Sequence, residues 1–162
     1  MKKISWPTFL YIAGYHLFLA IALPFYYMNH TPSFGLVMTT IALVFISGMA
    51  ITACYHRFYS HSCYKIHPAI ETILLFFGTL ATQGSAIKWA HDHRLHQAYV
   101  DTDKDPYSVK KGLWHAHMLW MFYQSPPIDP KVVSDLSRKK MLVFQHKYYV
   151  YCMLTTNILT FL

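Results

Sequence analysis

Two long uncharged apolar runs open the chain and predict helices that cross a membrane. No Lys, Arg, Asp or Glu occurs from Ile4 to His56, and residues 6–28 and 34–55 are almost wholly apolar or aromatic. About 20 such residues, at 1.5 Å per residue, cross roughly 30 Å of hydrocarbon. We therefore predict two spanning helices, at about 6–28 and 34–55, joined by a short turn that contains Pro32.

Three later segments are apolar over shorter lengths. Residues 68–84 carry apolar side chains at i, i+3, i+4 and i+7, which predicts a helix, but Glu71 and three threonines weaken a spanning assignment. We expect this helix to lie in the membrane interface or to pack under a site, with a re-entrant span as the alternative. Residues 112–123 are expected to be amphipathic or interfacial, and residues 148–162 have the composition of the start of a third span.

The basic residues indicate the orientation of these helices. Lys2 and Lys3 precede the apolar region, and the other twelve Lys and Arg residues fall between Arg57 and Lys147. Under the positive-inside rule, the N-terminus and the long segment after Tyr55 lie on the cytoplasmic side of a multi-pass protein. The net charge of +7 does not favour a nucleic-acid partner, because the basic residues are scattered and flank apolar segments.

These patterns predict the fold class. We expect an all-α fold: an integral membrane helical bundle with interfacial helices and a cytoplasmic cap that carries two histidine-rich clusters, incomplete at the C-terminus. Residues 1–162 are treated as a single domain. Three cysteines without CxxC spacing indicate neither a disulfide framework nor a thiolate zinc site.

The two histidine-rich clusters, HRFYSH and HDHRLHQ, follow the second predicted span. His93 and His96 are three residues apart on an expected helix at 85–99, so both rings can reach one centre. His56 and His61 are five apart, about 140° around a continuous α-helix, and converge only if the helix ends or bends between them.

Imidazole nitrogens suit iron, copper, zinc and nickel, so the clusters predict a nitrogen-rich metal site. Asp92, the one carboxylate in the clusters, is interpreted as an acceptor that orients a ligand imidazole. The other histidines outside the clusters are interpreted as structural or solvated residues: His16, His30, His67, His115, His117 and His146.

The segments HRFYSH, WAHDHRLHQ and YVDTDKDPYSVKKGLWHAHMLWMF resemble the first two histidine boxes and the following segment of membrane fatty acyl desaturases of the Δ9, acyl-CoA type. The resemblance covers nearly the whole chain, as the N-terminal portion of the family. It implies an enzyme with two non-haem irons that uses O₂ to place a cis double bond in a saturated acyl chain. It also implies a fatty acyl substrate, acyl-CoA or acyl-lipid, and an electron donor such as ferredoxin or cytochrome b5.

The resemblance assigns roles residue by residue. His56 and His61 match the first box, and His93 and His96 match the first two ligands of the second box, so these four are the implied iron ligands. Trp89 corresponds to an aromatic residue beside the acyl channel. The remaining implied substrate contacts, near the acyl head group, are Arg94 and Asp92.

The chain departs from the family pattern at Gln97, which stands where the second box ends in histidine. Glutamine is a poor substitute for a neutral imidazole at iron, and His91 is a weak candidate to compensate. A basic pair of the animal acyl-CoA members is replaced by Tyr123 and Gln124, so acyl-lipid or acyl-carrier substrates stay open. Lys110 and Lys111 are interpreted as a lipid-facing anchor rather than a head-group site.

The family's third histidine box is not found before Leu162, and four histidines do not saturate two irons. The sequence therefore predicts either a fragment of a longer desaturase or a truncated, catalytically impaired membrane protein derived from one. A related di-iron membrane hydroxylase is a further alternative, which the DTDKDP segment disfavours.

Overall fold

The structure, a computed structural model, describes residues 3–161. Helices dominate these residues, and the single β pairing among them is an isolated bridge between Ile4 and Tyr123, which confirms the all-α class. The chain divides into two compact units. One holds the residues up to Thr39 with Tyr99–Pro127, and the other holds Thr40–Ala98 with the residues from Ile128 onward.

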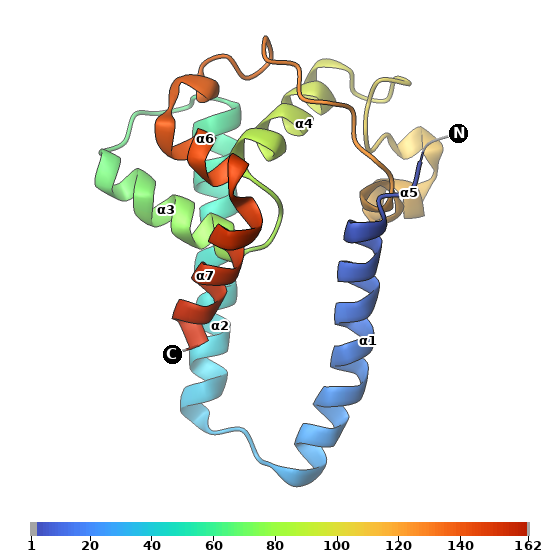
Figure 1. Cartoon of the computed structure of the whole chain (residues 1–162). Helices are drawn as coiled ribbons and strands as arrows, with labels where there is room; N and C mark the ends of the chain where they lie inside the picture. Colours follow the sequence, from blue (N-terminus) through green and yellow to red (C-terminus); the bar gives the residue numbers. More distant parts are fainter. Residues whose placement is uncertain (1–2, 162) are drawn as a thin grey trace. The chain divides into compact units, whose positions relative to one another are not determined.

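Two of the described helices are long and apolar enough to cross a membrane. The first is α1 (Trp6–Asn29), which buries none of its side chains in the protein. The second combines α2 (Phe34–Ala50) with η1 (Ile51–Ser60), a π-helix that continues it without a break (Figure 1). The predicted helices at 6–28 and 34–55 are therefore present, and the second runs on to Ser60.

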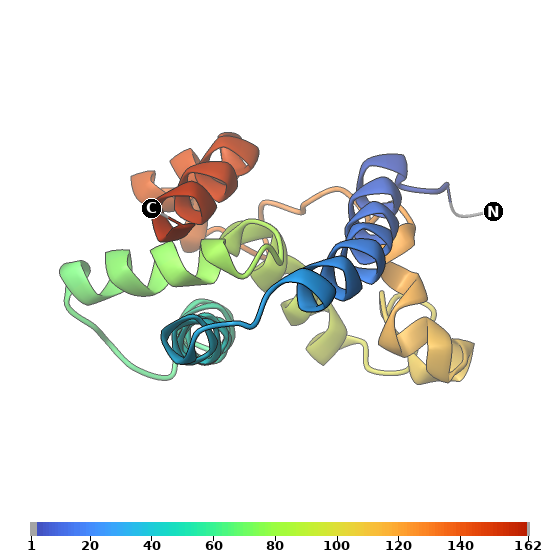
Figure 2. The ribbon, with the colours of Figure 1, turned by 90° about the horizontal axis from the view of Figure 1, so that it is seen from below.

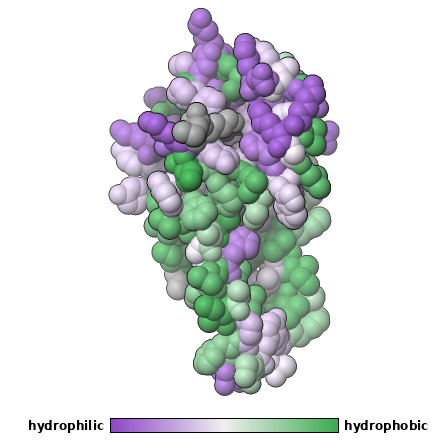
Figure 3. Space-filling model, turned by 90° about the vertical axis from the view of Figure 1, so that its right-hand side faces the viewer, coloured by the Kyte–Doolittle hydropathy of each residue, from purple (hydrophilic) through white to green (hydrophobic). Residues whose placement is uncertain are grey.

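In the first unit, α1 begins beside the segment predicted to be amphipathic or interfacial. That segment folds as α5 (Leu113–His117) and η3 (Leu119–Phe122), after the short η2 (Val109–Lys111). The Phe9 ring packs edge-on against Phe122 at 5.3 Å, and the Ser5 N–H donates to the Phe122 carbonyl at 2.8 Å. The surface over α1 is mainly hydrophobic (Figure 3).

The second unit holds the buried core of the described residues. Its further helices are α3 (Pro68–Leu80), α4 (Ala86–Ala98), η4 (Leu136–Arg138), α6 (Lys140–Lys147) and α7 (Tyr149–Phe161). The π-helix η1 packs against α3 and α4, while α6 packs against α4 and α7 against α3 (Figures 1 and 2). The buried apolar side chains that cluster in this core are Ile51, Cys54, Tyr55, Tyr59, Leu75, Ala86, Ile87, Ala90, Val133, Leu136 and Leu142.

The helix predicted at 68–84 ends at Leu80. Thr82 and Gly84 have φ values of 56° and 94°, and this left-handed backbone cannot continue an α-helix. The turn that results leads directly into α4, which matches the helix predicted at 85–99. Residues 149–161, in the segment predicted to start a third span, form the helix α7, and its role as a span stays a prediction.

Gly78 is needed for the close approach of α3 and η1. A Cβ atom at this position would lie 2.6 Å from the Tyr55 ring, and Tyr55 is fully buried. We expect Gly78→Ala to lower the free energy of unfolding by about 1–2 kcal/mol, because overpacking outweighs the gain in helix propensity. The thermal midpoint in detergent measures this effect.

Gly48→Ala is the matched control, because a Cβ at Gly48 meets nothing within 4 Å. It should raise stability by up to about 1 kcal/mol through helix propensity alone. A Gly78→Ala protein that melts at or above the wild-type temperature would contradict the close packing of Gly78 against the Tyr55 ring.

Candidate metal centre

The winding of η1 brings His56 and His61 together. The helix ends at Ser60, between the two residues, as their spacing requires. The sequence did not predict the π winding, in which hydrogen bonds join residues five apart and place them nearly one above the other. Accordingly, the His61 N–H donates to the His56 carbonyl at 3.2 Å, and their ring centroids lie 4.7 Å apart.

Local contacts support this winding. The Ser60 hydroxyl donates to the Tyr55 carbonyl, again five residues back, at 2.8 Å. The Tyr64 hydroxyl, from the segment after η1, donates to the Ala53 carbonyl within η1. Tyr55 and Tyr59 are buried: Tyr55 packs against Gly78 of α3 and Trp89 of α4, and the Tyr59 hydroxyl donates to Glu71 of α3. The core thus holds η1 at two buried tyrosines that lie on either side of His56 in the sequence.

The third imidazole comes from α4. The His93 Nε2 atom lies 3.0 Å from the His61 Nε2 atom, and the His93 ring centroid lies 4.5 Å from that of His56. His56, His61 and His93 form a three-histidine group, in which one ligand nitrogen from each residue lies within 4.8 Å of the others. Three imidazole nitrogens at this spacing are able to share one metal ion, which would replace the hydrogen bond between His61 and His93.

Trp89 forms one wall of the three-histidine group. Its ring stacks on His93 at 5.1 Å and meets His56 edge-on at 6.2 Å. Its indole N–H donates to the Gln83 side chain at 3.1 Å, and Tyr55 packs edge-on against its ring at 6.1 Å. Trp89 therefore restricts the ring of His93. The acyl-channel role assigned to it by resemblance stays a prediction.

The protonation of His93 suits a ligand. Burial, reinforced by the neighbouring imidazoles of His56, His61 and His96, lowers the pKa of His93 to about 4. Its ring is therefore neutral at pH 7 and keeps a lone pair for a metal ion.

His96, the fourth predicted ligand, lies beside the group rather than in it. Its ring centroid is 6.3 Å from that of His93, and the three-histidine group does not include it. The next residue, Gln97, is exposed. The structure therefore brings together three of the four predicted ligands, and the role of His96 stays a prediction.

His91 and Asp92 form a separate buried pair. The His91 Nδ1 atom lies 3.0 Å from an Asp92 carboxylate oxygen, and the His91 Nε2 atom accepts the Asp129 N–H at 3.1 Å. Lys88 forms an ion pair with the same carboxylate. The imidazole that Asp92 orients is therefore that of His91, which lies outside the group of His56, His61 and His93, rather than a ligand imidazole as predicted. Because both His91 nitrogens have protein partners, His91 does not replace the histidine missing at Gln97.

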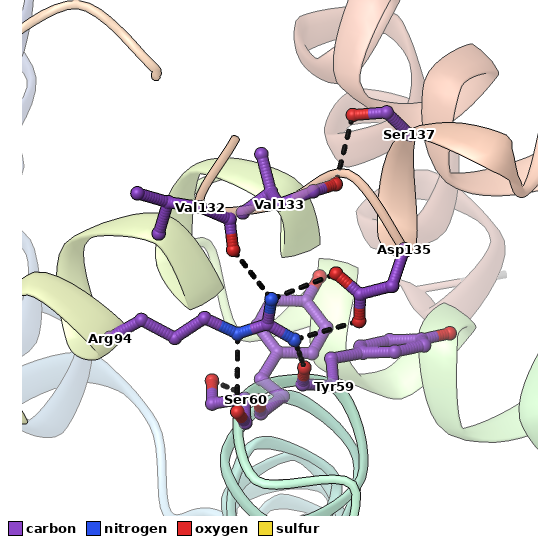
Figure 4. Close-up of polar contacts among 8 residues, drawn as sticks. Tyr59, Ser60, Arg94, Val132, Val133, Asp135 and Ser137 are labelled. Carbon is purple, nitrogen blue, oxygen red and sulfur yellow. Dashed lines mark hydrogen bonds and ion pairs between the residues drawn. The ribbon is translucent and has the colours of Figure 1, made fainter. Parts of the chain in front are cut away.

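Arg94 joins the end of η1 to the loop before η4 (Figure 4). Its guanidinium donates to the backbone carbonyls of Tyr59 at 2.6 Å, Ser60 at 3.1 Å and Val132 at 2.6 Å. Two further bonds of 2.8 Å reach the two carboxylate oxygens of Asp135. All five N–H donors of the guanidinium are thereby used within the protein. The carbonyls at the end of η1 gain partners that the helix itself cannot supply.

No sequence pattern predicts this bridge, because Asp135 lies 41 residues after Arg94 in a polar segment. Hydrogen bonds from Arg94 hold the pKa of Asp135 below its ordinary value. The head-group role assigned by resemblance to Arg94 and Asp92 stays a prediction.

The Arg94–Asp135 bridge predicts a pH-dependent stability. Because the pKa of Asp135 is lowered in the folded state, the bridge stabilises the protein above the usual carboxyl range and is lost as the pH falls through the folded value. Asp135→Asn should lower the free energy of unfolding at pH 7 by about 1 kcal/mol or less, because the carboxylate is half exposed.

The difference between Asp135→Asn and wild type should shrink as the pH is lowered below about 4. Asp103→Asn removes the same charge from an exposed position and serves as the control. Thermal melts at several pH values measure both variants. A difference that stays constant from pH 7 to pH 3 would rule out the bridge as its source.

Comparison with known proteins identifies relatives. No protein-family model matches the chain. A probable acyl-CoA desaturase of Schizosaccharomyces pombe is 45% identical over 106 residues, which cover 64% of this chain and 22% of the yeast protein. The sn-1 stearoyl-lipid 9-desaturase of Anabaena variabilis is 31% identical over 160 residues, which cover 97% of this chain and 57% of the relative. Over nearly its whole length, the chain is thus similar to curated fatty acyl desaturases.

A third desaturase, the Delta(9)-fatty-acid desaturase fat-6 of Caenorhabditis elegans, is 34% identical over 91% of the chain and 44% of the relative. The match to the Anabaena desaturase extends over so much of the chain that it includes both histidine clusters. The chain spans little more than half the length of the Anabaena desaturase, and its match to the yeast relative is a smaller part of that protein.

Proposed function

We propose that this chain is part of a membrane fatty acyl desaturase, which uses O₂ to introduce a cis double bond, at the Δ9 position, into a saturated acyl chain. The proposal is carried by one observation: three imidazoles with ligand nitrogens within 4.8 Å, in a chain whose relatives are named as desaturases. Bound iron would supply the O₂ activation that removal of hydrogens from an unactivated chain requires.

The proposed iron ligands are His56, His61, His93 and His96. Neutral imidazole is a suitable donor for iron, and the lowered pKa of His93 favours that form. Two irons need more ligands than these four residues provide. Since the relatives are longer than the match, we propose that the other ligands belong to the part of the enzyme that corresponds to their remaining length.

We propose a multi-pass membrane topology with the histidine clusters on the cytoplasmic side. Support comes from the two long apolar helices and from the basic residues concentrated after Tyr55. In this arrangement α3 is an interfacial helix of the bundle, and α7 is the start of a third span in the lipid bilayer.

The proposed substrate is a fatty acyl chain carried by CoA or by a lipid, because relatives of both kinds match. We place Trp89 beside this chain, next to the imidazoles on which it packs. A head-group contact by Arg94 would require the exchange of a protein partner, since its five donors are engaged. Electrons would come from a small redox protein such as ferredoxin or cytochrome b5.

Gln97 favours a second candidate function, a catalytically impaired membrane protein derived from a desaturase. The residue is exposed and follows His96 directly, at the position where the family pattern has a histidine. An amide binds iron less well than an imidazole, so a centre built with it would hold metal weakly.

Expression of the complete natural reading frame that contains this chain, in a desaturase-deficient host, tests the proposal. Gas chromatography of the cellular fatty acids should detect a cis-Δ9 monounsaturated product that disappears in the His93→Ala variant. A hydroxylated product would point to hydroxylation instead. Intact protein in the membrane without either product would favour the impaired protein.

A further inference from the structure

The beginning of α4 is held by side chains from a distant segment, residues 145–149. The Gly84 N–H donates to the Tyr149 hydroxyl at 2.9 Å, and the Ala86 N–H donates to the Gln145 side-chain oxygen at 3.0 Å. Between them, the Ser85 hydroxyl lies 2.6 Å from the His146 Nδ1 atom. Three consecutive residues at the start of α4 thus bind three side chains of one segment.

These contacts have a clear physical role. The first backbone N–H groups of a helix have no partner within the helix, and buried ones must find partners elsewhere. Ser85 supplies one partner as the residue before α4, because its hydroxyl accepts the Lys88 N–H at 3.3 Å. Gln145 supplies another from outside the helix. The position of α4 therefore depends on α6.

The same Gln145 amide also binds η1 and α3. Its nitrogen donates to the Tyr55 hydroxyl and to the Thr79 hydroxyl, each at 3.1 Å. The Gln145 residue is 4% exposed, so water does not compete for these bonds. One buried side chain on α6 therefore joins the three helices that surround it.

Two of these helices carry the three-histidine group. Tyr55 directly precedes His56 on η1, and its ring packs against Trp89, which stacks on His93. Gln145 lies outside the three-histidine group and is not one of its candidate metal ligands. Its bonds fix the helix that bears His56 relative to the helix that bears His93.

We propose that Gln145 is a positioning residue for the metal centre, acting through Tyr55 and the start of α4. His146 supports it at Ser85. This inference rests on the proposed function of the three-histidine group as a metal site. A small displacement of η1 against α4 would separate His56 from His93 and weaken a site that needs both.

Titration of the purified chain in detergent with Co²⁺ tests the proposal, with the d–d absorption of the bound ion as the readout. Gln145→Met keeps the size of the side chain and removes its hydrogen bonds. We expect its Co²⁺ dissociation constant to rise about tenfold, the lower end of the effect of residues that orient metal ligands, and the d–d spectrum to change. Val143→Ala, an exposed position on the same helix, should match wild type in both respects.

The outcomes separate the hypotheses. Wild-type protein that binds no Co²⁺ would overturn the proposed metal site and, with it, the role of Gln145. Wild-type protein that binds Co²⁺, with an unchanged dissociation constant and spectrum in Gln145→Met, would overturn the positioning role alone, even if the variant melts at a lower temperature.

If Gln145→Met does not fold, the His146→Ala variant tests the positioning role instead. This side chain is exposed, so its loss should leave the helical circular dichroism unchanged. We expect weaker Co²⁺ binding from the loss of the Ser85 contact. A dissociation constant equal to that of wild type would overturn the positioning role.

Discussion

Replacing His93 with alanine should abolish metal binding by this chain. His93 is the member of the three-histidine group that comes from α4, and its Nε2 atom lies 3.0 Å from that of His61. Without it, the two remaining imidazoles are those of His56, on η1, and His61, directly after it. Loss of a direct ligand should exceed the 10- to 100-fold loss of affinity, roughly, that follows removal of an outer partner.

Fe²⁺ or Co²⁺ titration of the purified chain measures this effect. His117→Ala is the matched control, because His117 is exposed and outside the three-histidine group. It should bind metal as the wild type does. Equal binding by His93→Ala and wild type would show that the three imidazoles do not form a metal site.

Replacing Arg94 with lysine should destabilise the protein strongly. Lysine keeps the positive charge but offers three donors at one point, so it cannot serve the three carbonyls and both oxygens of Asp135 that the guanidinium reaches in one plane. We expect a loss of about 2–3 kcal/mol, below the value for a fully buried ion pair because the Asp135 carboxylate is half exposed. The thermal midpoint in detergent measures it.

Arg57→Lys is the control, because it makes the same substitution at an exposed position of η1. The pair of variants also separates two roles of Arg94. A structural role predicts a lower melting temperature without any substrate present, whereas a head-group role alone predicts unchanged melting and weaker acyl binding. An Arg94→Lys protein as stable as wild type would contradict the structural role.

Much of the fold could be predicted because the apolar runs are governed by local physics. A helix must satisfy its own backbone hydrogen bonds in a bilayer, so an uncharged run of sufficient length predicts both the helix and its approximate ends. The helices α1 and α2 and the shorter α7 follow this reasoning. The end of α3 could not be predicted in this way, because a pattern of apolar positions does not reveal the left-handed backbone at Thr82.

The candidate site was predicted less completely. The spacing of His93 and His96 placed both on one face of α4, yet the structure groups His93 with His56 and His61 instead. The π winding that allows this depends on how η1 packs against α3 and α4, and residue spacing along the chain does not encode it.

The sequence by itself determined the two apolar helices, the histidine clusters and the resemblance to desaturases, since each depends on residues close together in the chain. The tertiary structure alone decided which imidazoles meet and what holds them. Arg94 finds Asp135 41 residues away, and Gln145 finds Tyr55 90 residues away. Single polar side chains leave no periodic signal in a sequence. Their partners are fixed only when the core excludes water and every buried donor must find an acceptor.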